Sequence, residues 1–137
     1  MALSRERVVA TAEALEQGRH AYVAGRFFEA VAIWEEAWRV ESGPHRRLLQ
    51  GLIQAAAAYL KMTVQPHPPG MVKLLDRALE TLRPLPDGFA SLQLDRLRLG
   101  LARSRDEAAA WAEDGPSPAG PAPLGSAVKV AVRLVRG

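Results

Sequence analysis

The sequence predicts an all-α protein, a compact bundle of five to six helices followed by a flexible C-terminal tail. Apolar residues recur at three- and four-residue steps through most of residues 1–113, the pattern of helices with one buried face. Residues 46–62 are apolar around the whole circumference of a helix, as expected of a helix that is enclosed by others. A chain of 137 residues that is 48% hydrophobic is long enough for one domain with its own core.

The first two helices are predicted to form a hairpin. We expect the first to begin after Ser4, a favourable N-cap, and to end at about Ala24, because Gly25 can adopt the left-handed conformation that closes a helix. The second covers about 27–40 and is broken by the segment 41–44 (ESGP). The hairpin resembles one tetratricopeptide repeat in the spacing of its small and large residues, which are Gly18, Gly25, Phe27, Ala30, Trp34 and Ala37. A single copy does not predict a solenoid, which needs about three.

The third helix, about 45–62, is predicted to be the centre of the bundle. The only strongly polar side chains within its segment LLQGLIQAAAAYL are Gln50 and Gln54, four residues apart on one face. A buried amide without a partner costs about 1–3 kcal/mol. We therefore expect both amides and the nearby acid, Glu35, to be engaged in hydrogen bonds between helices.

The remaining helices are bounded by proline and by capping residues. The segment 65–70 (QPHPPG) is predicted to be a stiff connector, because proline cannot continue a helix, and a fourth helix follows over about 71–83. Asp95 is expected to cap a fifth helix. Ser104 and Glu107 have the spacing of a capping box, which would divide this helix in two.

By composition, the chain divides into three parts. Residues 1–113 form the helical domain, residues 114–126 are a linker rich in proline, glycine and alanine, and residues 127–137 are a basic apolar tail. Alternating valine and leucine make the tail strand-like. Since a lone strand is unstable in water, the tail either pairs with a partner, packs on the domain as a short helix or stays disordered.

The net charge of +3 resides in this tail. Lys129, Arg133 and Arg136 lie in a segment without an acid, so the rest of the chain is formally balanced and offers no basic face to nucleic acid. Binding to nucleic acid would therefore depend on these three residues alone.

Several classes of protein are excluded by composition and motif. A chain without cysteine forms no disulfides and no thiolate metal sites. The N-terminus lacks the apolar run of a signal peptide, and the apolar stretch of the third helix is too short to span a bilayer, so we expect a cytoplasmic protein without membrane contact. No phosphate loop or nucleophile motif is present, and His20, His45 and His67 lack the spacing of metal ligands. We therefore predict no catalytic residue, no metal and no cofactor.

Three segments point to a family: 25–38 (GRFFEAVAIWEEAW), 46–61 (RRLLQGLIQAAAAYLK) and 70–82. Through them the sequence resembles the bacterial and archaeal family catalogued as domain of unknown function 309, over about residues 21–111. The resemblance implies a compact bundle of about five helices with no established activity.

This chain departs from that family at three of four positions. Members typically carry His-Glu where Val31 and Ala32 stand here, and often a His in place of Leu60. Those residue types could bind a metal or transfer protons, but only Glu35 of the set remains. The resemblance therefore implies that such a site does not work in the same way in this chain.

One candidate polar cluster remains where the second and third helices are expected to pair: Glu35, Trp38, Arg46, Arg47, Gln50 and Gln54. Because a lone carboxylate lacks the three or four ligands of a metal site, we interpret Glu35 as an acceptor of hydrogen bonds from the third helix. The leading functional hypothesis is a non-enzymatic protein-interaction or scaffold module that binds a protein partner or a second copy of the chain. The alternative is a degenerate metal-dependent or acid/base enzyme that uses Glu35, Gln50 and Gln54.

Overall fold

A computed structural model describes residues 2–63 and 66–114, without the side chains of residues 2–9. The described residues form five α-helices and a short 3-10 helix, with no strand among them, which confirms the predicted fold class. In chain order the elements are α1 (Ala2–Val23), α2 (Phe27–Val40), α3 (Gly43–Thr63), α4 (Pro68–Leu82), η1 (Phe89–Ser91) and α5 (Leu94–Asp114).

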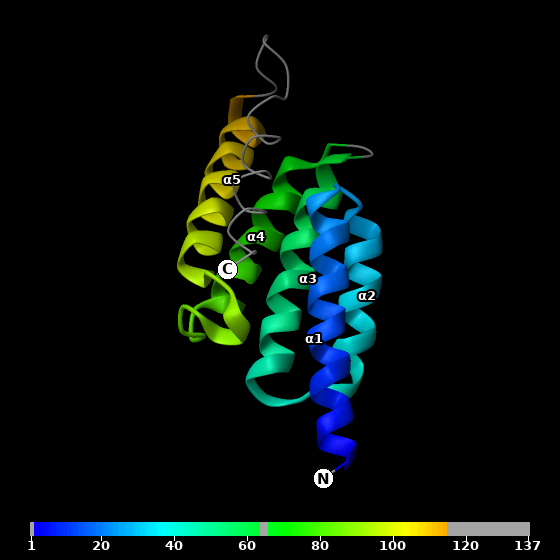
Figure 1. The fold of residues 1–137 in the computed structure, drawn as a ribbon. Helices are drawn as coiled ribbons and strands as arrows, with labels where there is room; N and C mark the ends of the chain where they lie inside the picture. The colour runs from blue at the N-terminus through cyan, green and yellow to red at the C-terminus, as the bar shows by residue number, and fades with distance from the viewer. Residues whose placement is uncertain (1, 64–65, 115–137) are drawn as a thin grey trace.

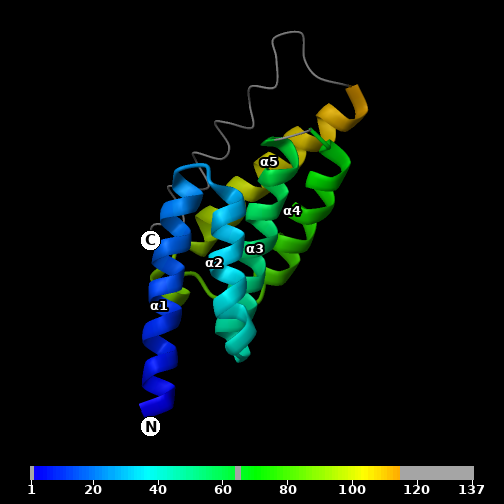
Figure 2. The ribbon, with the colours of Figure 1, turned by 90° about the vertical axis from the view of Figure 1, so that its right-hand side faces the viewer.

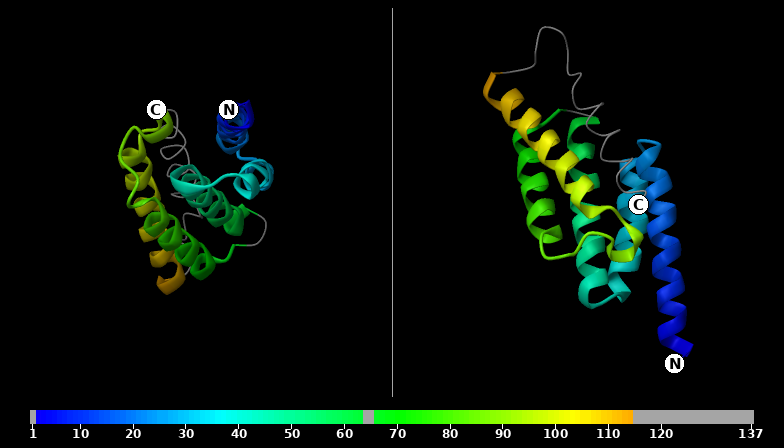
Figure 3. Two further views of the ribbon diagram at one scale, coloured as in Figure 1. Left: turned by 90° about the horizontal axis from the view of Figure 1, so that it is seen from below. Right: turned by 60° about the vertical axis from the view of Figure 1, so that its left-hand side comes forward.

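Each helix packs mainly on its neighbours in the chain (Figures 1 and 2). The extensive contacts join α1 to α2, α2 to α3, α3 to α4, and α4 to α5. Seen along the helices, α1 and α5 stand on the same side of α3 rather than against each other (Figure 3, left). Short connections from α1 to α4 produce this order, because they hold each helix antiparallel to the previous one. The longer segment 83–93, which contains η1, joins α4 to α5.

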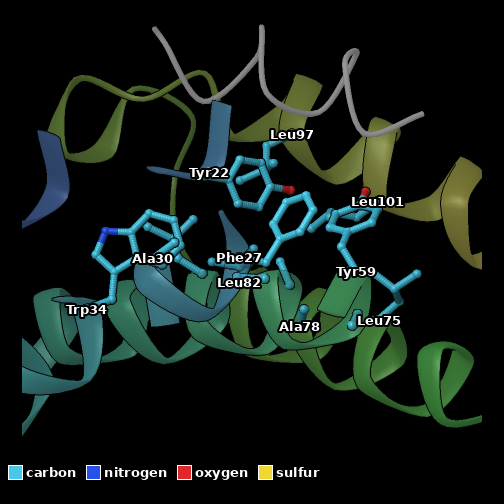
Figure 4. Packing of buried hydrophobic residues seen from close by; sticks show 14 of the residues in the cluster. Tyr22, Phe27, Ala30, Trp34, Tyr59, Leu75, Ala78, Leu82, Leu97 and Leu101 are labelled. Carbon is cyan, nitrogen blue, oxygen red and sulfur yellow. The ribbon is translucent and has the colours of Figure 1, made fainter. Parts of the chain in front are cut away.

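The central position of α3 agrees with its sequence. Eight of its residues are buried, and they are Leu48, Leu49, Gly51, Leu52, Ala55, Ala56, Ala58 and Tyr59. They meet Trp34 of α2 and Leu75 of α4 in one hydrophobic core (Figure 4). The expectation that α3 is enclosed on every side is wrong at Gln50, which is exposed, because α2 and α4 leave one stripe of α3 open to solvent.

The α1–α2 hairpin forms where it was predicted, with one difference at its start. Gly25 has φ +80° and ends α1, while α2 has the predicted bounds. Gly18 lies directly against the indole of Trp34, so a side chain there would overlap the ring. Ser4 is not the N-cap, because α1 already begins at Ala2.

Both later helices differ from the prediction at proline and capping positions. Pro68 and Pro69 occupy the first turn of α4, where the N–H that proline lacks would have no acceptor within the helix, so the connector is shorter than expected. The carboxylate that caps α5 comes from Asp87, whose Oδ1 accepts from the backbone N–H of Asp95 at 3.1 Å. No break occurs at Ser104, which is buried in the middle of α5.

Asp114 is the last residue of α5, so the predicted linker contributes one residue to that helix. The rest of the linker and the whole tail, residues 115–137, lie outside the described part of the chain. The strand-like pattern and the cations of the tail therefore stay predictions. Among the described helices, none is both long and apolar enough to cross a membrane.

Candidate functional site

The first contact between predicted site residues joins α2 to α3. The guanidinium carbon of Arg46 lies 3.9 Å from the centroid of the Trp38 ring. A cation over an aromatic face at this distance is attracted by the ring quadrupole, more strongly where water is partly excluded. Both side chains are half-buried, so this pair closes one end of the α2–α3 interface.

The opposite end of the same interface is fixed by two aromatic rings. Phe27, at the start of α2, stacks on Tyr59, near the end of α3, with ring centroids 5.5 Å apart. The two helices are therefore antiparallel and in register along their length. Residues three, four or seven apart lie on one face of a helix, so the half-buried residues beside this interface form one row on each helix. We call these six half-buried residues the α2–α3 seam: Val31, Glu35, Trp38, Arg46, Ile53 and Leu60.

Three of the positions that the family resemblance singled out are seam residues. Val31 and Glu35 lie on one side of it and Leu60 on the other, while Ala32 is exposed beside them. Glu35 forms no hydrogen bond or ion pair with the other described residues, so the bonds expected from α3 are not made there. Residues 10–63 and 66–114 contain no group of three His, Cys, Asp or Glu side chains suited to a metal ion.

Arg47 and Gln54 turn away from Glu35 to the end of α4. Arg47 Nε donates to the carbonyl oxygen of Thr81 at 2.7 Å, and the hydroxyl of Thr81 donates to Gln54 Oε1 at 2.8 Å. The bond from Arg47 satisfies a carbonyl in the last turn of α4, where carbonyl groups have no N–H donor within the helix. The predicted cluster therefore divides into three parts. Glu35, Trp38 and Arg46 belong to the seam, Arg47 and Gln54 contact α4, and the amide of Gln50 is exposed to solvent.

A second polar cluster, which sequence reasoning missed, lies between α1, α3 and α5. The hydroxyls of Tyr59 and Ser104 are hydrogen-bonded at 2.9 Å, and both residues are buried. The ring of Tyr22 approaches that of Tyr59 edge-on, with centroids 5.9 Å apart (Figure 4). Glu107 lies one turn beyond Ser104 on α5 and carries a buried carboxylate oxygen. Polar residues within the apolar third helix and within α5 could have indicated this cluster. The spacing of Ser104 and Glu107, however, predicts a helix cap.

Burial shifts the titration of this cluster. It raises the pKa of Tyr59 to about 12, although the hydrogen bond to Ser104 acts in the opposite direction. It also raises the pKa of Tyr22 well above that of a free tyrosine. Desolvation raises the pKa of Glu107, against the positive charge of Arg103. In all three groups the environment favours the neutral form over the charged one.

These pKa shifts predict that the native protein does not form tyrosinate around pH 10, where a free tyrosine ionises. Both phenols bind their protons more tightly when folded, so they contribute stability below pH 10 that is lost as the pH rises through the higher native pKa values. Since the chain has two tyrosines, ultraviolet absorbance of tyrosinate reports on both. The signal should rise together with the loss of helical circular dichroism, whereas protein in urea should titrate around pH 10. A native protein that titrates near pH 10 contradicts the buried placement.

Comparison with known proteins places the seam within a recognised sequence region. Residues 15–74 match the model of a family described as a domain of unknown function (DUF309). This match confirms the family resemblance for the end of α1, all of α2 and α3, and the first half of α4. The resemblance over the rest of α4 and over α5 stays a prediction. Among curated proteins, no sequence matches the chain.

Proposed function

We propose that this chain is a non-enzymatic protein-interaction module of the cytoplasm, and that its contact surface surrounds Phe28 at the start of α2. The observation that carries the proposal is the exposure of this side chain, which is 73% accessible to solvent. Burying a phenylalanine side chain against a partner contributes about 1.5–3 kcal/mol. An aromatic side chain left this open on a well-packed helix is therefore a strong candidate for an interface anchor.

Neighbouring residues extend this apolar surface. Ala32 follows Phe28 by one helical turn and is exposed, and Val31 lies beside both at the edge of the seam. The antiparallel pairing of α2 with α3 brings Leu60 to the same end of the seam. We call Phe28, Val31, Ala32 and Leu60 the Phe28 patch. Single exposed apolar residues are common on soluble proteins, whereas apolar residues grouped on one face mark a contact surface, and the proposal takes these four as such a group.

Packing of consecutive helices supports the same function. Each helix lies on its chain neighbours, as in modules built from helical hairpins, which present open helix faces to partners. The contact between Gly18 and Trp34 is of the kind that the tetratricopeptide-like spacing predicts, a small residue against a large one. This architecture leaves the outer side of α2 free to bind a partner protein or a second copy of the chain.

The test compares Phe28→Glu with Leu99→Glu. Leu99 is 57% exposed on α5 and serves as a matched control, because the same change there adds the same charge away from the Phe28 patch. Light scattering over a range of concentrations measures self-association, and affinity capture from a lysate measures partner binding. We expect Phe28→Glu to abolish one of these associations and Leu99→Glu to preserve it, with unchanged circular dichroism for both. A monomer whose captured proteins are the same for wild type and Phe28→Glu contradicts the proposal.

The alternative, a degenerate metal-dependent or acid/base enzyme, depends on Glu35. This carboxylate is half-buried at the middle of the seam and has no cationic partner among the described residues. A thermal-shift series with Zn²⁺, Mn²⁺ and Mg²⁺ on wild type and Glu35→Gln decides between the two ideas. An increase in Tm that wild type shows and Glu35→Gln lacks would favour the enzyme; equal curves favour the interaction module.

A further inference from the structure

Helices α1, α3 and α5 each bring polar side chains to one buried point around the hydroxyl of Tyr59. Ser104 binds that hydroxyl directly, at 2.9 Å. The hydroxyls of Tyr22 and Tyr59 lie close enough for each to shift the pKa of the other by charge and by hydrogen bonding, but no hydrogen bond of ordinary geometry joins them. Glu107 also acts on Tyr59 through its charge, from the same side of α5 as Ser104. Tyr59 is therefore the hub of a four-residue polar cluster.

Two atoms of this cluster are buried without a hydrogen-bond partner among the described residues. They are the hydroxyl of Tyr22, a residue 1% exposed, and Oε2 of Glu107. A tyrosine hydroxyl donates one hydrogen bond, and a carboxylate oxygen accepts. Buried polar atoms in native proteins are nearly always paired with protein or with ordered water, so each unpaired one calls for an explanation.

The other unpaired buried atoms do not form such a set. Trp34 Nε1, Trp38 Nε1 and Arg46 Nε are all donors. Trp34 lies against Gly18, and the other two belong to the same cation–aromatic pair. Within residues 10–63 and 66–114, only the cluster around Tyr59 combines an unpaired donor and an unpaired acceptor beside groups that are already hydrogen-bonded.

We propose that this cluster binds one internal water molecule, which accepts a hydrogen bond from the hydroxyl of Tyr22 and donates one to Glu107. A buried water needs two to four polar partners, and Tyr22, Tyr59 and Glu107 supply them. The water links α1 to α5, two helices that share no extensive contact of their own in the described structure. The water thereby connects the first and last helices of the bundle on the side of α3 that faces α1 and α5.

The decisive variant is Tyr22→Phe, which removes one oxygen atom and keeps the ring. If the hydroxyl binds water, its loss should lower Tm by ~4 °C and speed hydrogen exchange in α1, because a partnered hydroxyl stabilises the folded state. If the hydroxyl is unpaired, its removal leaves Tm unchanged or raises it, since an unsatisfied buried group is a cost. The latter result overturns the proposal.

Two further measurements make the test specific. Tyr59→Phe breaks the known bond to Ser104 and calibrates the cost of losing a partnered hydroxyl at this site. In a double-mutant cycle, Tyr22→Phe and Glu107→Gln should be non-additive if one water joins the two groups. A crystal structure should show a water within hydrogen-bond distance of both residues and lose it in Tyr22→Phe. Strict additivity, or a direct hydrogen bond from Tyr22 to Tyr59 or Glu107 in the crystal, rejects the bridging water.

Discussion

Replacing Gly18 by alanine is expected to lower the free energy of unfolding by about 3 kcal/mol, at the upper end of the usual cost of overpacking a core. A methyl group at this position would overlap Nε1 and Cε2 of the Trp34 indole and lie 2.6 Å from its Cδ1. Trp34 has no exposed surface and is held between α1 and α3, so the ring cannot move away without displacing α1. Urea unfolding followed by circular dichroism measures the effect.

A neighbouring substitution and a compensating one make this prediction specific. Gln17→Ala changes the adjacent, exposed residue of α1 and should alter stability by less than ~0.5 kcal/mol. The double variant Gly18→Ala, Trp34→Leu gives the new methyl room, so Gly18→Ala should cost much less in that background than in wild type. Equal costs in both backgrounds would show that the ring is not the obstacle.

The positions of the helices could be predicted wherever local signals agree with packing. The bounds of α2 follow from an apolar stripe between Gly25 and the break at ESGP, and both signals act within a few residues of the chain. The burial of α3 follows from its apolar circumference. For these elements local preference and tertiary contact favour the same structure, so the sequence alone predicts where each helix lies and whether it is buried.

Site residues could be predicted less well, because their roles depend on partners distant in the sequence. Ser104 and Glu107 have the spacing of a helix cap, yet Tyr59, 45 residues away, accepts or donates the hydrogen bond that fixes Ser104 inside α5. Helical spacing predicts Arg47 and Gln54 in one cluster with Glu35, whereas both are hydrogen-bonded to Thr81 of α4. Spacing along one helix gives the face on which a side chain lies, but the neighbouring helix decides which group it meets.

Arg98→Ala is the second substitution expected to have a large effect, a loss of ~3 kcal/mol. Nη1 of Arg98 donates to the carbonyl oxygens of Leu82 at 2.8 Å and Leu85 at 3.2 Å, where α4 ends. Carbonyls at a helix C-terminus have no donor within the helix, and α4 has no basic residue of its own in its last turn. Each hydrogen bond from a charged donor contributes about 1.5–3 kcal/mol. Its removal deprives the carbonyl of buried Leu85 of its donor and leaves that of Leu82 with only the backbone N–H of Leu85, at 3.1 Å.

The geometry of the guanidinium, rather than its charge alone, should account for this stabilisation. Besides the two carbonyls, Arg98 holds Asp95 through Nη2 at 2.6 Å, so one planar group ties the start of α5 to the end of α4. Lysine offers a single ammonium and cannot reproduce this fork, so Arg98→Lys should recover less than half of the loss. Arg96→Ala, two residues away on the exposed side of α5, is the matched control and should leave the urea midpoint unchanged. If Arg96→Ala and Arg98→Ala lower the midpoint equally, the loss reflects the net charge of α5 and not the carbonyls at the end of α4.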